Sequence, residues 1–248
     1  MQTEHKKVYF FATCLGGIAY SGTCLNAIKL LQKEGIEVIF KKDQTCCGQP
    51  SLNSGFYEDS KKIALHNIEL FKEPYPIVVP SGSCAGVMKQ DYLEIFANDG
   101  NYAQVKEFSK RVYELSDFLL KELKVKYEDA KQNKTRITWH SNCHALRTAK
   151  SIESNKKLLR QLKNVELVEL ENEEECCGFG GTFSIKEPEI SNAMVLEKIA
   201  DIKAQNVEYV VSADAGCLLN ISGAMKKHGV KVKPVHLYDF IAERINLQ

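Results

Sequence analysis

Eight of the nine cysteines in this 248-residue chain form a pattern that occurs twice. In each occurrence a single cysteine is followed by a Cys-Cys-Gly triplet, and a fourth cysteine comes later. Packing alone does not demand the same residue type at matched positions, so we interpret both sets of four as ligands. The matched pairs are Cys14 and Cys143, Cys46 and Cys176, Cys47 and Cys177, and Cys84 and Cys217, at offsets of 129, 130, 130 and 133.

Four thiols per set indicate a soft metal centre. Thiolates select zinc, copper(I) or iron–sulfur clusters over hard cations. Two adjacent cysteines point in different directions, so they grip two irons of a cluster more easily than one small ion. The glycines after each pair, Gly48 and Gly178, allow positive φ and let backbone N–H groups approach cluster sulfides. We predict a cluster or zinc at Cys14, Cys46, Cys47 and Cys84, and a cluster at Cys143, Cys176, Cys177 and Cys217.

The remaining candidate residues have simpler interpretations. Cys24 lies outside the repeat, in a helical stretch, and we expect it in the hydrophobic core. His140 and His144 flank Cys143 and offer zinc ligands, although a polar loop that supports the cysteine is the favoured interpretation. No Ser–His–Asp or Cys–His nucleophile pattern emerges, so the catalytic residues are unknown.

Short apolar runs alternate with helical stretches in both halves of the chain. This alternation predicts an α/β fold of two pseudo-symmetric βαβ halves, each a small parallel sheet flanked by helices. Sites in such sheets form at the carboxyl ends of strands, so we expect each set of cysteines to converge there. The expected strands are 8–11, 37–40, 77–79, 136–139, 165–170 and 209–211, and the expected helices are 22–33, 58–71, one beginning near Cys84, 152–162, 188–204 and 217–227.

A polar stretch at 126–134 is the expected linker between the halves. We therefore predict two cysteine-rich domains, at residues 1–130 and 131–248. A further echo ends each unit, at 115–119 and 237–241. His236 matches Glu114 in this echo, and we expect no shared role for two such different side chains.

The charge balance excludes several partner classes. The chain has 33 Lys and Arg against 32 Asp and Glu, a net charge of +1, which leaves no basic field for nucleic acid or an anionic membrane. No apolar run approaches the roughly 20 residues that a membrane helix needs. We see no export signal and expect the reducing cytoplasm, where cysteines more often bind metal or catalyse than form disulfides.

The doubled pattern resembles the paired CCG domains of the heterodisulfide-reductase-like, cysteine-rich family. That family includes a cysteine-rich subunit of heterodisulfide reductase and the iron–sulfur subunits of glycolate oxidase and anaerobic glycerol-3-phosphate dehydrogenase. The compact chain, with two CCG units and nothing else, most resembles the lactate-utilisation members, which belong to a bacterial L-lactate dehydrogenase complex. The resemblance implies an oxidoreductase subunit with [4Fe–4S] clusters, which transfers electrons while the complex oxidises L-lactate to pyruvate.

The chain departs from the full family motif at two positions. The complete motif ends in Cys-x-x-Cys, and here Ser81 and Asp214 replace the first cysteine of that pair. Each half then matches an ordinary four-iron cube, or a variant in which Asp214 or Ser81 lends oxygen, and the Ser81 half is also open to zinc. The chain has no ferredoxin-type cysteine run. The resemblance therefore implies partner subunits, including a separate ferredoxin-like iron–sulfur protein.

Two other functions stay open at this point. One is a disulfide or heterodisulfide reductase subunit, or the iron–sulfur subunit of a glycolate or glycerol-3-phosphate dehydrogenase. The other is a zinc-stabilised scaffold without a redox role. Missing fifth thiols weigh against heterodisulfide cleavage, and no Arg or Lys is clearly placed to clamp a substrate carboxylate.

Overall fold

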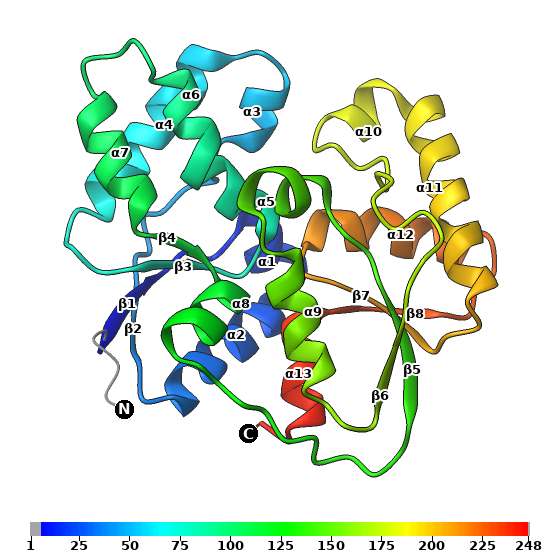
Figure 1. The fold of residues 1–248 in the computed structure, drawn as a ribbon. Helices are drawn as coiled ribbons and strands as arrows, with labels where there is room; N and C mark the ends of the chain where they lie inside the picture. The colour runs from blue at the N-terminus through cyan, green and yellow to red at the C-terminus, as the bar shows by residue number, and fades with distance from the viewer. Residues whose placement is uncertain (1–5, 248) are drawn as a thin grey trace.

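The computed structural model describes residues 6–247, which form two similar halves built on four-stranded sheets (Figure 1). The strand order is β2-β1-β3-β4 in the first half and β6-β5-β7-β8 in the second. All paired strands are parallel, and helices flank both sheets. The predicted α/β fold with two similar halves is confirmed.

Each half has four strands separated by helical segments, but the number of helices differs between the halves. The first half contains β1 (Lys7–Phe10), α1 (Cys14–Ala19), α2 (Ser21–Lys33), β2 (Glu37–Phe40), α3 (Gln49–Asn53), α4 (Tyr57–Leu70), β3 (Ile77–Val79), α5 (Gly82–Gly86), the π-helical turn η1 (Val87–Asp91), α6 (Tyr92–Ile95), α7 (Tyr102–Lys110), β4 (Val112–Glu114), α8 (Leu115–Asp117) and the π-helical turn η2 (Phe118–Glu122). The second half contains β5 (Thr135–Trp139), the π-helical turn η3 (Ala145–Ala149), α9 (Ile152–Arg160), β6 (Val165–Val168), α10 (Phe183–Lys186), α11 (Pro188–Ala204), β7 (Tyr209–Ser212), α12 (Ala215–Lys227), β8 (Lys233–His236) and α13 (Leu237–Arg244). Within residues 6–247, no helix combines the length and the apolar character needed to cross a membrane.

Each sheet has one edge strand that the sequence did not predict. The three residues of β3 are apolar and fully buried, as is typical of a parallel strand covered on both faces. The edge strands β4 and β8 are short and mixed in polarity, so they lack the apolar run by which a buried strand is recognised. Pro234 in β8 suits an edge, because proline has no N–H to donate.

The matched residues Glu114 and His236 share a structural role, which corrects the expectation that they have none. Each immediately precedes a helix, α8 or α13. The Glu114 carboxylate accepts a hydrogen bond from the Ser116 N–H at 2.9 Å, and the His236 Nδ1 accepts one from the Tyr238 N–H at 3.4 Å. Carboxylate and imidazole are chemically different, but both satisfy a free donor in the first turn of a helix.

The two halves share one hydrophobic core. Phe10 and Leu31 of the first half belong to the same buried cluster as Trp139 and Leu237 of the second. Helix α13 packs against α2 and α9, and α8 packs against α9, so these four helices fill the space between the sheets (Figure 1). Because this core is continuous, the facing edges of the two sheets are held in a fixed relation.

Buried contacts hold the expected linker, residues 126–134, against the end of α13. Arg244 at the end of α13 donates to both carboxylate oxygens of Asp129, at 3.0 and 2.5 Å, and both side chains are buried. The N–H of Ala130 also donates to the carbonyl of Arg244 at 2.9 Å. Buried contacts therefore cross the predicted boundary at residue 130, and the division into two domains stays a prediction.

Candidate metal centre

All eight repeated cysteines line one cavity of about 310 Å³. Cys14 begins α1 after β1, the Cys46–Cys47 pair follows β2, and Cys84 lies in α5 after β3. The second set repeats this arrangement: Cys143 follows β5, Cys176 and Cys177 follow β6, and Cys217 lies in α12 after β7. The cysteines converge because the carboxyl ends of parallel strands meet at one edge of a sheet, and the two edges face each other.

In the first set, which we call the first quartet, the thiols of Cys14 and Cys46 are in contact. The Sγ atoms of Cys14 and Cys46 are 3.7 Å apart. Hydrogen bonds from Cys14 and Cys47 lower the pKa of Cys46 to about 3. Cys47 and Cys84 are both buried. The lowered pKa favours the thiolate form of Cys46, which is the form that binds metal.

In the second quartet (Cys143, Cys176, Cys177 and Cys217), the pKa of the corresponding cysteine is also lowered. Hydrogen bonds from Cys143 and Cys177 lower the pKa of Cys176 to about 2. The Gly178 N–H donates to the Cys176 sulfur at 3.4 Å. In both halves the pKa of the first cysteine of the adjacent pair is therefore lowered.

The glycine of each triplet is required by the backbone. Gly48 has φ of 87° and Gly178 has φ of 77°, a region that other residues rarely adopt. A Cβ atom on Gly178 would lie 2.6 Å from the carbonyl oxygen of Ser191. The repeated Cys-Cys-Gly order thus has a local reason: the chain turns sharply straight after its paired thiols.

The donor set fits a thiolate-bound metal group. All nine cysteines are free, so none of the described thiols is consumed by a disulfide. Each quartet mixes buried sulfurs with half-buried or exposed ones, and Cys14 is exposed. Soft, clustered thiols of this kind select zinc or iron–sulfur centres. Cys24 is buried in the core shared by the halves and does not line the cavity, which confirms its predicted place.

Asp214 bridges the two halves beside the cavity. Its Oδ1 caps α12 by accepting from the N–H groups of Gly216 at 3.1 Å and Cys217 at 3.3 Å. Its Oδ2 accepts a hydrogen bond from the Ser81 hydroxyl at 3.0 Å and another from the Ser83 hydroxyl. Ser81 and Asp214, the two predicted oxygen ligands, therefore contact each other, and their role as ligands stays a prediction.

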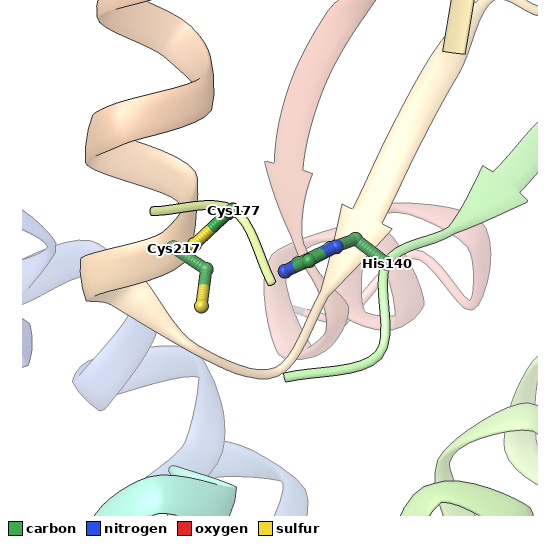
Figure 2. A group of neighbouring side chains, drawn as sticks. All are labelled: His140, Cys177 and Cys217. Atoms are coloured by element: carbon green, nitrogen blue, oxygen red, sulfur yellow. The ribbon is translucent and has the colours of Figure 1, made fainter. Parts of the chain in front are cut away.

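The two histidines near Cys143 lie in different environments. His144 Nε2 lies 3.2 Å from Asp91 Oδ2 in η1 and its Nδ1 lies 3.9 Å from the Cys143 sulfur, so it links the supporting loop to the first half. His140 is fully buried, and burial lowers its pKa to about 4, which keeps the imidazole neutral. A ring nitrogen of His140 and the sulfurs of Cys177 and Cys217 all lie within 4.8 Å of one another (Figure 2).

The cavity wall carries no cation for a substrate carboxylate. Among the described residues that line it there is neither Lys nor Arg. Apart from the thiols, the wall includes the uncharged side chains of Gln49, Asn53, Thr182 and Ile185, together with His140, His144 and Asp214.

Comparison with known proteins identifies the repeat. A family model described as CCG, cysteine-rich domain, matches residues 8–89 and 137–222, one segment in each half. The Lactate utilization protein A of Shouchella clausii is 42% identical over 93% of this chain and 96% of that protein. The Lactate utilization protein A of Geobacillus sp. WCH70 is 40% identical over 96% of this chain and 100% of that protein.

A solved structure shows the same fold in a longer chain. A hypothetical protein from Helicobacter pylori superposes with a TM-score of 0.62 at 11% identity, covering 98% of this chain and 49% of that chain. At this identity the likeness concerns the fold alone. The doubled Cys-Cys-Gly pattern, the matched segments and the full-length relatives agree, and the chain belongs to the CCG cysteine-rich-domain family together with the Lactate utilization A proteins.

Proposed function

We propose that this chain is an iron–sulfur electron-transfer subunit of a cytosolic complex that oxidises L-lactate to pyruvate. The observation that carries the proposal is the arrangement of eight free cysteines, in two matched quartets, around one cavity. The names of the relatives add the process, lactate utilisation. Lactate oxidation releases two electrons and two protons, and the two quartets offer two places for one-electron carriers.

The four thiols of each quartet would hold one [4Fe–4S] cluster. A cluster bound there supplies a carrier that accepts and passes a single electron. The chain's own contribution is to hold the cysteines on one side of each sheet and to aim backbone N–H groups, such as that of Gly178, at the sulfurs. The number of such hydrogen bonds and the exposure of each quartet set the reduction potential.

The substrate and the onward electron path belong to partner subunits in this proposal. The cavity wall has no cation to bind the lactate carboxylate, so we place lactate on another chain. A separate ferredoxin-like protein would then exchange electrons with the quartets. The exposed Cys14 marks the accessible side of the first quartet.

Metal content tests the proposal directly. The protein purified without oxygen should contain iron and acid-labile sulfide, absorb broadly in the visible, and give an electron paramagnetic resonance signal on reduction. Cys47→Ala and Cys177→Ala should each remove about half of the iron. Cys24→Ala is the matched control, because Cys24 is buried in the core away from the cavity.

The lactate assignment needs the assembled complex. L-Lactate should reduce this chain only when its partner subunits are present, and the Cys177→Ala complex should oxidise lactate far more slowly. Zinc in both quartets in place of iron contradicts the electron-transfer role. Unchanged lactate oxidation after deletion of this chain contradicts its place in the pathway.

A further inference from the structure

His140 is a fully buried residue whose side chain lacks any hydrogen bond. Neither ring nitrogen has a partner among the residues that the structure describes. Its backbone is satisfied, because its N–H donates to Val211 O at 2.9 Å and its carbonyl accepts from the Ser212 hydroxyl at 3.0 Å. A buried polar group without a partner costs about 1–3 kcal/mol, so an imidazole in this state calls for an explanation.

The neighbouring polar groups are engaged elsewhere. The Lys198 ammonium donates to the carbonyls of Asn172 and Glu173, and both Asp214 oxygens accept from other donors. What lies beside the ring is sulfur: one ring nitrogen and the Sγ atoms of Cys177 and Cys217 are mutually within 4.8 Å. Figure 2 shows the ring directed from the end of β5 toward the space beside these two cysteines.

The first half shows that packing does not require an imidazole here. His140 lies three residues before Cys143, and Phe11 lies three residues before Cys14. The following turns match, since Thr13 accepts from the Gly16 N–H at 3.1 Å and Asn142 accepts from the Ala145 N–H at 2.7 Å.

Phe11 at the equivalent place is fully buried and packs 5.7 Å from the ring of Phe71, measured between centroids. The same backbone position thus holds a plain aromatic ring in one half and an imidazole in the other. The nitrogen atoms of His140 are therefore an addition specific to the second half.

We propose that His140 is a nitrogen ligand of the metal centre held by the second quartet. The first centre would then have sulfur donors, and the second a mixed sulfur–nitrogen set. The inference rests on the proposed metal binding by Cys143, Cys176, Cys177 and Cys217. Imidazole is a ligand for both iron and zinc. His140 would be a nitrogen donor in addition to the four thiolates, and it would replace none of them.

Nitrogen hyperfine coupling tests the proposal without an activity assay. The protein is labelled with ¹⁵N-histidine, purified without oxygen, reduced, and studied by pulsed electron paramagnetic resonance. We expect coupling from a directly bound imidazole nitrogen, and complete loss of it in His140→Phe, which copies the residue of the first half. His228→Phe is the matched control: His228 is exposed at the end of α12 and should leave the coupling unchanged.

The outcomes separate this inference from the proposed function. Full iron content without nitrogen coupling in the unmodified protein, or coupling that survives in His140→Phe, overturns the inference alone. A second quartet that binds no metal overturns both. Zinc in the second quartet refutes the electron-transfer role of that quartet. Zinc X-ray absorption then tests the His140 ligand. Loss of a nitrogen scatterer in His140→Phe supports His140 as a ligand, and an unchanged spectrum overturns it. If His140→Phe does not fold, the spectrum of the labelled unmodified protein decides.

Discussion

Removal of the Arg244 guanidinium should destabilise the protein strongly. Arg244 is 3% exposed and donates to Asp129 at 3.0 and 2.5 Å and to the Thr135 hydroxyl at 3.1 Å. In Arg244→Met the buried Asp129 carboxylate keeps only the N–H groups of Lys131 and Asn164, both at 3.0 Å. Breaking a buried ion pair by removing one partner costs about 3–5 kcal/mol, and we expect this loss in the free energy of unfolding.

Urea unfolding under nitrogen, followed by circular dichroism, measures this loss. Variants are compared at equal metal content, because a bound metal adds its own stabilisation. Arg136→Met is the matched control, since Arg136 forms an exposed pair with Glu166 at 3.3 Å and side-chain exposures of 40% and 63%. An exposed pair contributes about 0–1 kcal/mol. The reasoning is refuted if Arg244→Met costs no more than Arg136→Met.

The Arg244–Asp129 pair should make this loss in the free energy of unfolding depend on pH. Burial alone raises the pKa of Asp129, but hydrogen bonds from Arg244 and from two backbone N–H groups outweigh it, and the net pKa lies below the ordinary 3.8. The stabilisation by Arg244 is therefore complete above this ordinary value and disappears as the pH falls through the lowered one. The gap between the wild type and Arg244→Met should narrow in acid, and a constant gap would contradict the account.

Three further predictions test other parts of the structure. Burial raises the pKa of Glu114 from 4.5 to about 7, so the stability of the wild type should fall as the pH rises from 4.5 to 7. Thermal melts of Glu114→Gln over the same pH range should lack this fall. The same dependence of melting temperature on pH in both proteins would disprove the shift. Asp214→Ala should lower the free energy of unfolding by about 1–3 kcal/mol, because α12 loses its cap and the Ser81 hydroxyl loses its acceptor. Asp214→Asn keeps an acceptor oxygen and should recover most of this loss in urea unfolding. Equal losses in both variants would contradict the capping role. Gly178→Ala should destabilise the protein by about 1–3 kcal/mol, because φ is 77° and the new Cβ meets the Ser191 carbonyl. Gly223→Ala, on an open face of α12, is the control and should stabilise the protein by up to about 1 kcal/mol. Equal effects of the two variants would mean that the turn at Gly178 tolerates a side chain.

Much of the site could be predicted because its signal is local and repeated. Residue type and order around Cys46–Cys47–Gly48 and its copy indicate ligation without knowledge of distance. Glycine after each cysteine pair indicates a turn with positive φ, which Gly48 and Gly178 adopt. The alternation of apolar runs and helical stretches predicted the two parallel sheets. It missed β4 and β8 because their few residues are mixed in polarity and follow no strand pattern.

Other features depend on contacts between residues far apart in the chain. Nothing near Cys24 or Asp129 in the sequence indicates a core shared by both halves, or the pairing of Asp129 with Arg244 across 115 positions. Glu114 and His236 differ in chemistry, and only their place before a helix shows that both are caps.

The sequence by itself determined which residues are candidates for binding a soft metal and that they come in two matched sets, because side-chain chemistry and spacing are properties of the chain. Only the tertiary structure decided that both sets line one cavity and that Asp214 joins Ser81 there. It alone also places the unpartnered ring of His140 beside Cys177 and Cys217. Burial and proximity arise when the two sheets pack against their common helices, and no local pattern encodes that packing.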